Sequence, residues 1–234
     1  MFNSFRQTLC TIIATNDYRY TNVTQNSQLF FLHIVRLPFL KGLLHNNLTM
    51  LIFKTQKELR GYLEQFSTQI IGFVPTMGAL HQGHLSLIEN AKQTADIVVC
   101  SIFVNPTQFN DSKDFEKYPI THDQDIDLLE KKGCNVLYLP ESVEDVYQNE
   151  KKISVDLGNI ANVMEGANRP GHFNGVVQVV SVLFDIVKPN KAFFGLKDFQ
   201  QYCIIKRMVH ELKLDIDIVG CSIVREESGL AMSS

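Results

Sequence analysis

Two histidines three residues apart, His81 and His84, stand in a segment whose residue types favour anion binding. An apolar run precedes them at 70–74 and a helical pattern follows at 85–91, so we expect a buried strand, a tight glycine turn and a helix that carries both imidazoles. A helix begins with unpaired backbone N–H groups and the positive end of its dipole, which suit a phosphate chain. Side chains at i and i+3 share a helix face, so both rings can donate to one anion. The pattern predicts a nucleotide site.

Two other interpretations of the histidine pair stay open. The rings could cap the helix or remain solvated on an ordinary strand-to-helix turn. As metal ligands they would need partners, and no further Cys or His cluster with ligand spacing accompanies them. The flanking Pro75–Gly78 and Gly83 make the nucleotide interpretation more specific than the pair alone.

A second polar position follows the apolar run at 97–104. There Gln108 lies in a loop stiffened by Pro106, and its amide could recognise a hydroxyl or carboxylate group. An ordinary loop amide is the alternative. Further along, Arg169 and His172 belong to a glycine-punctuated loop and could reach an anion, but a structural turn explains them equally well.

The junction at 193–201 has the same strand-to-helix character. Gly195 would let the backbone approach a ligand, and Lys197 could neutralise a phosphate as a point charge. Asp198 could cap the following helix or hold a ribose or magnesium. Gln201, one turn on, would face the same cleft.

Strand and helix patterns alternate from residue 50 onward, which predicts right-handed crossovers and a doubly wound, Rossmann-like parallel α/β sheet. Ligands bind such sheets at the carboxyl ends of the strands, near the point where the strand order reverses. The candidate residues follow strand ends. We expect strands at 70–74, 97–104, 136–139, 191–194 and 216–219. We expect helices at 56–66, 123–132, 175–187 and 199–212, and one that carries both histidines and ends near residue 94.

Composition limits the possible partners and location of the 234-residue chain. A net charge of −3 without a basic tract argues against nucleic acid, and the apolar stretch at 29–44 is too short and interrupted to span a membrane. Five scattered cysteines indicate reduced thiols of a cytoplasmic protein. Residues 1–49 are poor in acids and are interpreted as an atypical, poorly ordered extension, with a transit peptide as the alternative. Residues 50–234 form the predicted domain.

Five ordered motifs within 50–234 resemble the pantothenate synthetase (pantoate–β-alanine ligase) family. They are Pro-Thr-Met-Gly-Ala-Leu-His-x-Gly-His, Phe-Val-Asn-Pro-Thr-Gln-Phe, Arg-Pro-Gly-His-Phe-x-Gly-Val, Phe-Phe-Gly-x-Lys-Asp-x-Gln-Gln and Gly-Leu-Ala-Met-Ser-Ser. The His-x-Gly-His element alone is shared with the wider nucleotidyl transferase superfamily.

The resemblance implies an enzyme that uses ATP, with Mg²⁺ carried on the nucleotide, to join pantoate to β-alanine through pantoyl adenylate, and that forms a homodimer. It implies His84 as proton donor beside His81 and Lys197, and Gln108 and Gln201 as pantoate ligands, with Gln108 also near β-alanine. No separate metal ligands are implied. The implied ATP-binding residues are Met77, Gly78, Ala79, Leu80, His81, Gln82, Gly83, His84, Gly195, Leu196, Lys197, Asp198, Val224, Met232, Ser233 and Ser234.

Two features depart from the family pattern. Leu196 stands where the family commonly has Glu, although the neighbouring Lys and Asp remain. The chain ends at Ser234, before the Arg-Asn that usually follows and before the C-terminal domain that closes over ATP. We therefore expect impaired activity, with a non-catalytic nucleotide-binding remnant or a related nucleotidyl transferase as alternatives.

Overall fold

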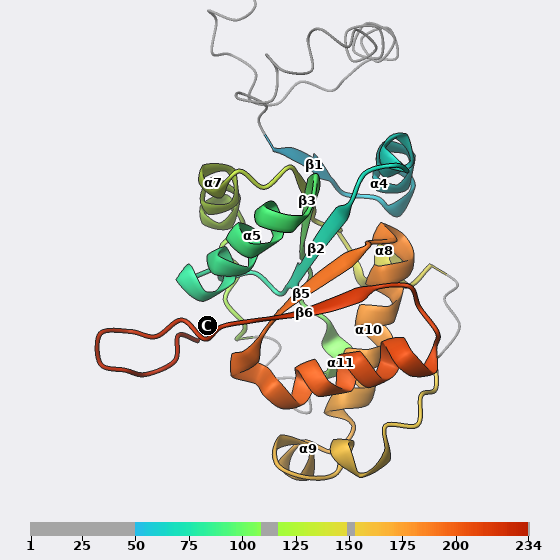
Figure 1. Ribbon diagram of the computed structural model, residues 1–234, viewed down its shortest axis with the longest axis vertical. Helices are drawn as coiled ribbons and strands as arrows, with labels where there is room; N and C mark the ends of the chain where they lie inside the picture. The colour runs from blue at the N-terminus through green and yellow to red at the C-terminus, as the bar shows by residue number, and fades with distance from the viewer. Residues whose placement is uncertain (1–49, 109–116, 149–152, 234) are drawn as a thin grey trace, which may run out of the picture. The chain divides into compact units, whose positions relative to one another are not determined.

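Six parallel strands form the centre of the computed structural model (Figure 1). The structure describes residues 50–108, 117–148 and 153–233, so the predicted extension at 1–49 lies outside the described residues. The strands run side by side in the order β1-β4-β3-β2-β5-β6. The doubly wound α/β class predicted from the sequence is confirmed. The strand bounds are β1 (Leu51–Phe53), β2 (Ile71–Thr76), β3 (Ile97–Ile102), β4 (Val136–Tyr138), β5 (Lys191–Gly195) and β6 (Asp217–Cys221).

The strand order reverses between β2 and β5. From β2 the chain moves outward through β3 to β4, and it later returns to the other side of β2 to add β5 and then β6. The segments that leave the carboxyl ends of β2 and β5 therefore start from neighbouring strands. This is the position at which open parallel sheets bind ligands.

Helices cover both faces of the sheet (Figure 1). On one face α5 (Gln82–Thr94) and α7 (His122–Lys132) share a core with β2, β3 and β4. The larger core on the opposite face is built with α4 (Gln56–Leu63), α8 (Val143–Tyr147), α10 (His172–Val187) and α11 (Phe199–Glu211). Short helical segments complete the described chain: η1 (Glu64–Phe66), η2 (Pro106–Gln108), η3 (Gly158–Ala161), α9 (Glu165–Asn168) and η4 (Leu196–Asp198).

The distribution of apolar residues along the chain explains why these elements form. All six residues of β3 are buried, with Val99 in one core and Cys100 in the other, as expected for a central parallel strand. The α10 helix is rich in valine and other apolar residues, and most of its residues are buried. Among the described residues, no helix is long and apolar enough to cross a bilayer.

Candidate functional site at the carboxyl ends of β2 and β5

A tight turn links β2 to α5 and brings the histidines to the sheet edge. Gly78 and Ala79 both have positive φ angles, 88° and 50°. This region suits glycine and is strained for alanine. The carboxylate of Asp125 accepts the backbone N–H groups of Ala79 and Leu80, at 3.0 and 2.8 Å. The turn is thus held from α7, an element distant in sequence.

His81 and His84 cap the start of α5 together. His81 is the N-cap residue and precedes the helix, whereas the sequence placed it inside. Its Nδ1 accepts the N–H of Gly83 at 3.0 Å, and Nδ1 of His84 accepts the N–H of His81 at 3.3 Å. Because a backbone N–H only donates, each Nδ1 carries a lone pair, and in the neutral ring the proton lies on Nε2. The ring centroids are 4.1 Å apart. Both histidines therefore cap the helix and keep an Nε2–H group for another acceptor.

This arrangement corrects part of the prediction of unpaired amides at the helix start, because the N–H of Gly83 is bonded to Nδ1 of His81 and the N–H of His84 to the carbonyl of His81. The N–H groups of Ala79, Leu80, His81 and Gly83 are all bonded to the side chains of Asp125 or the two histidines. The capping interpretation and the nucleotide interpretation are therefore compatible. This capping leaves the Nε2–H group of each imidazole available as a donor.

The two imidazoles are neutral near pH 7. Burial, which is the largest cause, together with His81 and the positive charge of Lys197 lowers the pKa of His84 to about 4. Burial, followed by the Lys197 charge, also lowers the pKa of His81. The rings therefore offer N–H dipoles, and the formal positive charge comes from Lys197 rather than from the histidines.

Lys197 lies in η4, directly after β5, close enough to act electrostatically on both imidazoles. Its Nζ atom is 3.2 Å from Oγ of Ser233 and 3.4 Å from Oδ1 of Asp198. Asp198 occupies the N-cap position of α11, but its side chain makes no capping hydrogen bond there. The capping alternative for this carboxylate is therefore wrong, and its contact is with the lysine.

The segment after β6 returns to the same place. The carbonyl of Val224 accepts the N–H of Met232 at 3.1 Å, beyond a narrow loop that contains Gly229. A Cβ atom added to Gly83 would lie 3.9 Å from Cβ of Met232. Met232 thus lies beside the histidine turn, Ser233 lies beside Lys197, and the ATP-binding role of this segment stays a prediction. Ser234 lies outside the described residues.

Gln108 sits between the histidine turn and α10. Its buried side chain donates from Nε2 to Sδ of Met77 at 2.6 Å. The backbone carbonyl of Gln108 lies 2.8 Å from Nδ1 of His172. A carbonyl only accepts, so Nδ1 of His172 carries the proton. Burial lowers the pKa of His172, which favours this neutral form. His172 therefore holds the Gln108 loop through this hydrogen bond, which is the structural role that the sequence left open beside anion binding.

The two glutamines at the start of α11 differ in their surroundings. Gln200 is buried, donates from Nε2 to the carbonyls of Ile160 and Val163 at 2.7 Å each, and accepts the N–H of Glu165. It fastens the α9 region to α11. Gln201 is half-buried, and its pantoate role stays a prediction.

Arg169, a further anion candidate, forms an ion pair with Glu165 at 2.7 Å. This i, i+4 pair sits on α9 and its C-cap, so the described contact of Arg169 is structural. The sequence also missed Asp125. Its spacing of four from the buried Leu129 placed an acid on the apolar side of α7, which could have signalled a buried carboxylate.

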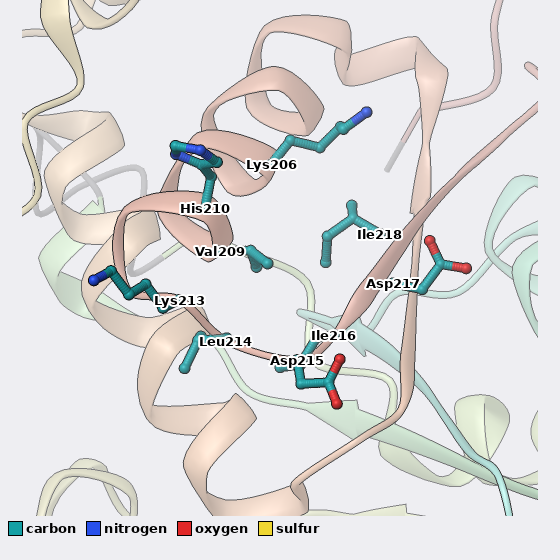
Figure 2. Close-up of a pocket in the computed structure, with 9 residues that line it drawn as sticks. All are labelled: Lys206, Val209, His210, Lys213, Leu214, Asp215, Ile216, Asp217 and Ile218. Carbon is teal, nitrogen blue, oxygen red and sulfur yellow. The ribbon is translucent and has the colours of Figure 1, made fainter.

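A surface hollow between α11 and β6 is separate from these residues (Figure 2). Its lining includes the last turns of α11 and the amino end of β6, whereas the histidine turn lies at the carboxyl ends of the strands. Figure 2 shows Lys206, His210 and Lys213 pointing in different directions. These side chains do not converge on a common ligand position.

Metal binding by the described residues depends on their donor groups. No three His, Cys, Asp or Glu side chains in the described part of the chain are grouped to hold an ion. The histidine Nδ1 atoms already accept backbone hydrogens. Neither Nδ1 lone pair is therefore free to bind a metal ion.

Paired Nε2–H donors and a lysine at the switch point of a doubly wound sheet define a Rossmann-like protein of the nucleotidyl transferase type. The chain belongs to the pantoate-beta-alanine ligase family, whose family model matches residues 51–234. A pantothenate synthetase from Porphyromonas gingivalis is 53% identical over 187 residues, which cover 79% of this chain and 66% of the relative. One from Acinetobacter baylyi is 52% identical over 167 residues, 71% of this chain and 59% of the relative.

Solved structures show the same likeness. A pantoate-beta-alanine ligase from Francisella tularensis, complexed with beta-gamma ATP and beta-alanine, superimposes with a TM-score of 0.75 at 44% identity. The match covers 79% of this chain and 71% of that one. Pantothenate synthetase from Thermus thermophilus gives a TM-score of 0.74 at 44% identity, over 79% of this chain and 66% of that one. The chain thus spans about two thirds of the length of these relatives.

Proposed function

We propose that the protein joins pantoate to β-alanine at the expense of ATP, through a pantoyl-adenylate intermediate. One observation carries this proposal: two imidazoles with available Nε2–H groups and the ammonium of Lys197 come together from neighbouring strands. That combination suits a triphosphate. The nucleotide and amino acid in the Francisella tularensis complex belong to the same substrate classes.

Binding of ATP is assigned to the three segments that meet at this edge. The histidine turn and Lys197 would contact the phosphates, and Val224 and Met232 would border the nucleotide from the third segment. Gln108 would hold pantoate and lie near β-alanine, and Gln201 would add a second pantoate contact. The full proposed set for ATP is Met77, Gly78, Ala79, Leu80, His81, Gln82, Gly83, His84, Gly195, Leu196, Lys197, Asp198, Val224, Met232, Ser233 and Ser234.

The proposed reaction has two displacements. A carboxylate oxygen of pantoate attacks the α-phosphorus, and the bond to the pyrophosphate oxygen breaks. The amine of β-alanine, having lost a proton, then attacks the acyl carbon and AMP leaves. The first step needs alignment and stabilisation of the charge on pyrophosphate. Lys197 and the two Nε2–H groups would provide both.

His84 would act first as a hydrogen-bond donor. With a pKa of about 4, its ring is neutral and holds its proton on Nε2. Transfer of a proton from an imidazolium requires a higher pKa, which the negative charge of a bound triphosphate would promote. The proton-donor role is thus tied to the nucleotide complex.

Three further assignments belong to the proposal. Mg²⁺ would arrive on the ATP phosphates and supply positive charge to the leaving pyrophosphate. A homodimer is proposed from the family resemblance, and light scattering can test this oligomeric state. A cytoplasmic location is supported by the free thiols of Cys100, Cys134, Cys203 and Cys221, which suit a reducing compartment.

Exchange of labelled pyrophosphate into ATP tests the first step without the second. We expect exchange that depends on pantoate and needs no β-alanine, and AMP accumulation only when β-alanine is added. A pantoate analogue without the terminal hydroxyl is the matched control. Equal exchange with the analogue would contradict the substrate assignment. Exchange without amide formation would favour a nucleotidyl transferase, and ATP binding without any exchange would favour a non-catalytic nucleotide-binding domain.

A further inference from the structure

A buried carboxylate stands behind the histidine turn and has no part in the reaction described above. Asp125, in the first turn of α7, is 1% exposed. None of the ion pairs found among the described residues includes it. A buried carboxylate is costly unless hydrogen bonds compensate for the lost water. Its partners therefore indicate why it is tolerated.

The partners of Asp125 are mainly backbone groups of the turn. Oδ1 accepts the N–H of Leu80 at 2.8 Å, and Oδ2 accepts the N–H of Ala79 at 3.0 Å. Oδ2 also accepts the hydroxyl hydrogen of Thr121 at 3.2 Å. Bonds from N–H donors to an ionised carboxylate are stronger than neutral ones. A bidentate acceptor for two consecutive amides fixes both peptide planes.

The turn needs such a constraint. Ala79 has a φ of 50°, which a non-glycine residue adopts at a cost, and Gly78 has a φ of 88°. Asp125 also packs against Gly78, where an added Cβ would lie 3.1 Å from its Oδ2 atom. The residue that follows the turn is His81, which begins the imidazole pair. The carboxylate thus fixes the direction from which the chain enters α5.

We propose that Asp125 is a positioning residue that holds the 78–80 turn, and with it the two imidazole donors, in the conformation that binds the triphosphate. The effect of Asp125 on ATP binding rests on the proposed function. The protection of the Ala79 and Leu80 amides by Asp125 can be measured without any nucleotide.

The decisive variant is Asp125→Asn. The amide oxygen can still accept one N–H, but the amide NH₂ then faces the second N–H group, donor against donor. Positioning predicts ATP binding weaker by about tenfold or more, because one charge-assisted bond is lost and one buried donor is left unpaired. A purely electrostatic role predicts the opposite sign, since removing a negative charge near a triphosphate strengthens binding. Calorimetric ATP titration well below Tm separates the two.

Asp123→Asn is the matched control. Asp123 lies in the same first turn of α7 and is exposed, so the variant removes the same charge without touching the 78–80 turn. We expect it to leave ATP affinity unchanged or slightly stronger. Equal weakening in both variants would overturn the positioning role.

Amide hydrogen exchange gives the independent readout. Asp125→Asn should speed exchange at Ala79 and Leu80 while helix amides in α10 stay protected. A residue needed only for overall stability would lower Tm and leave both this local pattern and ATP affinity of the folded protein unchanged. Unchanged protection at both amides, or ATP binding as tight as in the parent chain, would overturn the inference.

Two outcomes need separate treatment. If the parent chain does not bind ATP, the proposed function fails, and exchange at Ala79 and Leu80 still decides whether Asp125 holds the turn. If Asp125→Asn does not fold, Thr121→Val replaces it, because this variant removes only the third hydrogen bond. There we expect the same direction with about a threefold loss of ATP affinity, and no change would count against the proposal.

Discussion

Nδ1 of His84 accepts the backbone N–H of His81, so the second histidine of the motif completes the capping of the helix that the first begins. The two ring nitrogens of His84 therefore have different roles. Nδ1 stabilises the helix start, and Nε2 is available to a ligand. The two roles can be separated by substitution.

His84→Asn and His84→Gln form a matched pair. Asparagine places an amide near the position of Nδ1 and should keep the cap, whereas glutamine reaches toward Nε2 and should lose it. We expect His84→Asn to unfold near the parent temperature but to bind ATP about tenfold or more weakly, as loss of a hydrogen bond to a charged group predicts. His84→Gln should lose about 1 kcal/mol of stability and retain more affinity. Thermal unfolding and calorimetry measure both. ATP binding by His84→Asn at parental strength would argue against an Nε2 contact.

The depressed pKa of His84 predicts acid destabilisation. Its folded-state pKa of about 4 lies below the unfolded value of 6.5, so the unfolded chain binds more protons between these pH values. Stability from this group is complete above pH 6.5 and is lost as pH falls toward 4. The loss should amount to about 2–3 kcal/mol. Urea unfolding at several pH values tests this.

His84→Asn is the control for the pH series. His81 and His172 also have lowered pKa values and add to the acid sensitivity of the parent chain. The difference between parent and variant therefore isolates His84. Parallel pH profiles for the two proteins would contradict a depressed His84 pKa.

Removal of the Lys197 charge should be visible at the histidines. The ammonium lowers the pKa of both His81 and His84, so Lys197→Met should raise both values, and histidine resonances followed by NMR report them without any ligand. The same variant should weaken ATP binding. Lys206→Met makes the same charge change on α11, beside Tyr202, and should leave both histidines unaffected. Unshifted resonances in Lys197→Met would place the lysine away from the imidazoles.

The fold was predictable because its elements differ strongly in pattern. The continuous apolar run of β3 and the long, valine-rich segment of α10 are each compatible with few other secondary structures. Bounds shifted where a turn residue joined a helix, since α10 begins at His172 rather than 175 and α7 at His122 rather than 123. Local caps and turns determine such ends, and residue patterns describe them poorly.

For the site, the sequence predicted which segments come together but not the contacts between their residues. Motif spacing placed His81, His84 and Lys197 after strand ends, and the switch point between β2 and β5 brings them together. The protonated nitrogen of each ring depends on contacts with Gly83 and His81 that need three-dimensional placement. Asp125 reaches the turn from 45 residues away, a relation that local pattern does not contain.

A glycine in α10 tests how the Gln108 loop is supported. An added Cβ at Gly175 would lie 2.6 Å from the carbonyl oxygen of Thr107 and 2.9 Å from Cα of Gln108, distances that force backbone to move. Gly175→Ala should therefore destabilise the protein by about 1–3 kcal/mol, as overpacking does, and raise KM for pantoate. Gly61→Ala in α4 is the control, because its Cβ meets nothing within 4 Å. That variant should gain up to about 1 kcal/mol from helix propensity alone. Chemical denaturation and pantoate-dependent pyrophosphate exchange measure the two effects. A stabilised Gly175→Ala with unchanged KM would show that the loop is not held against α10.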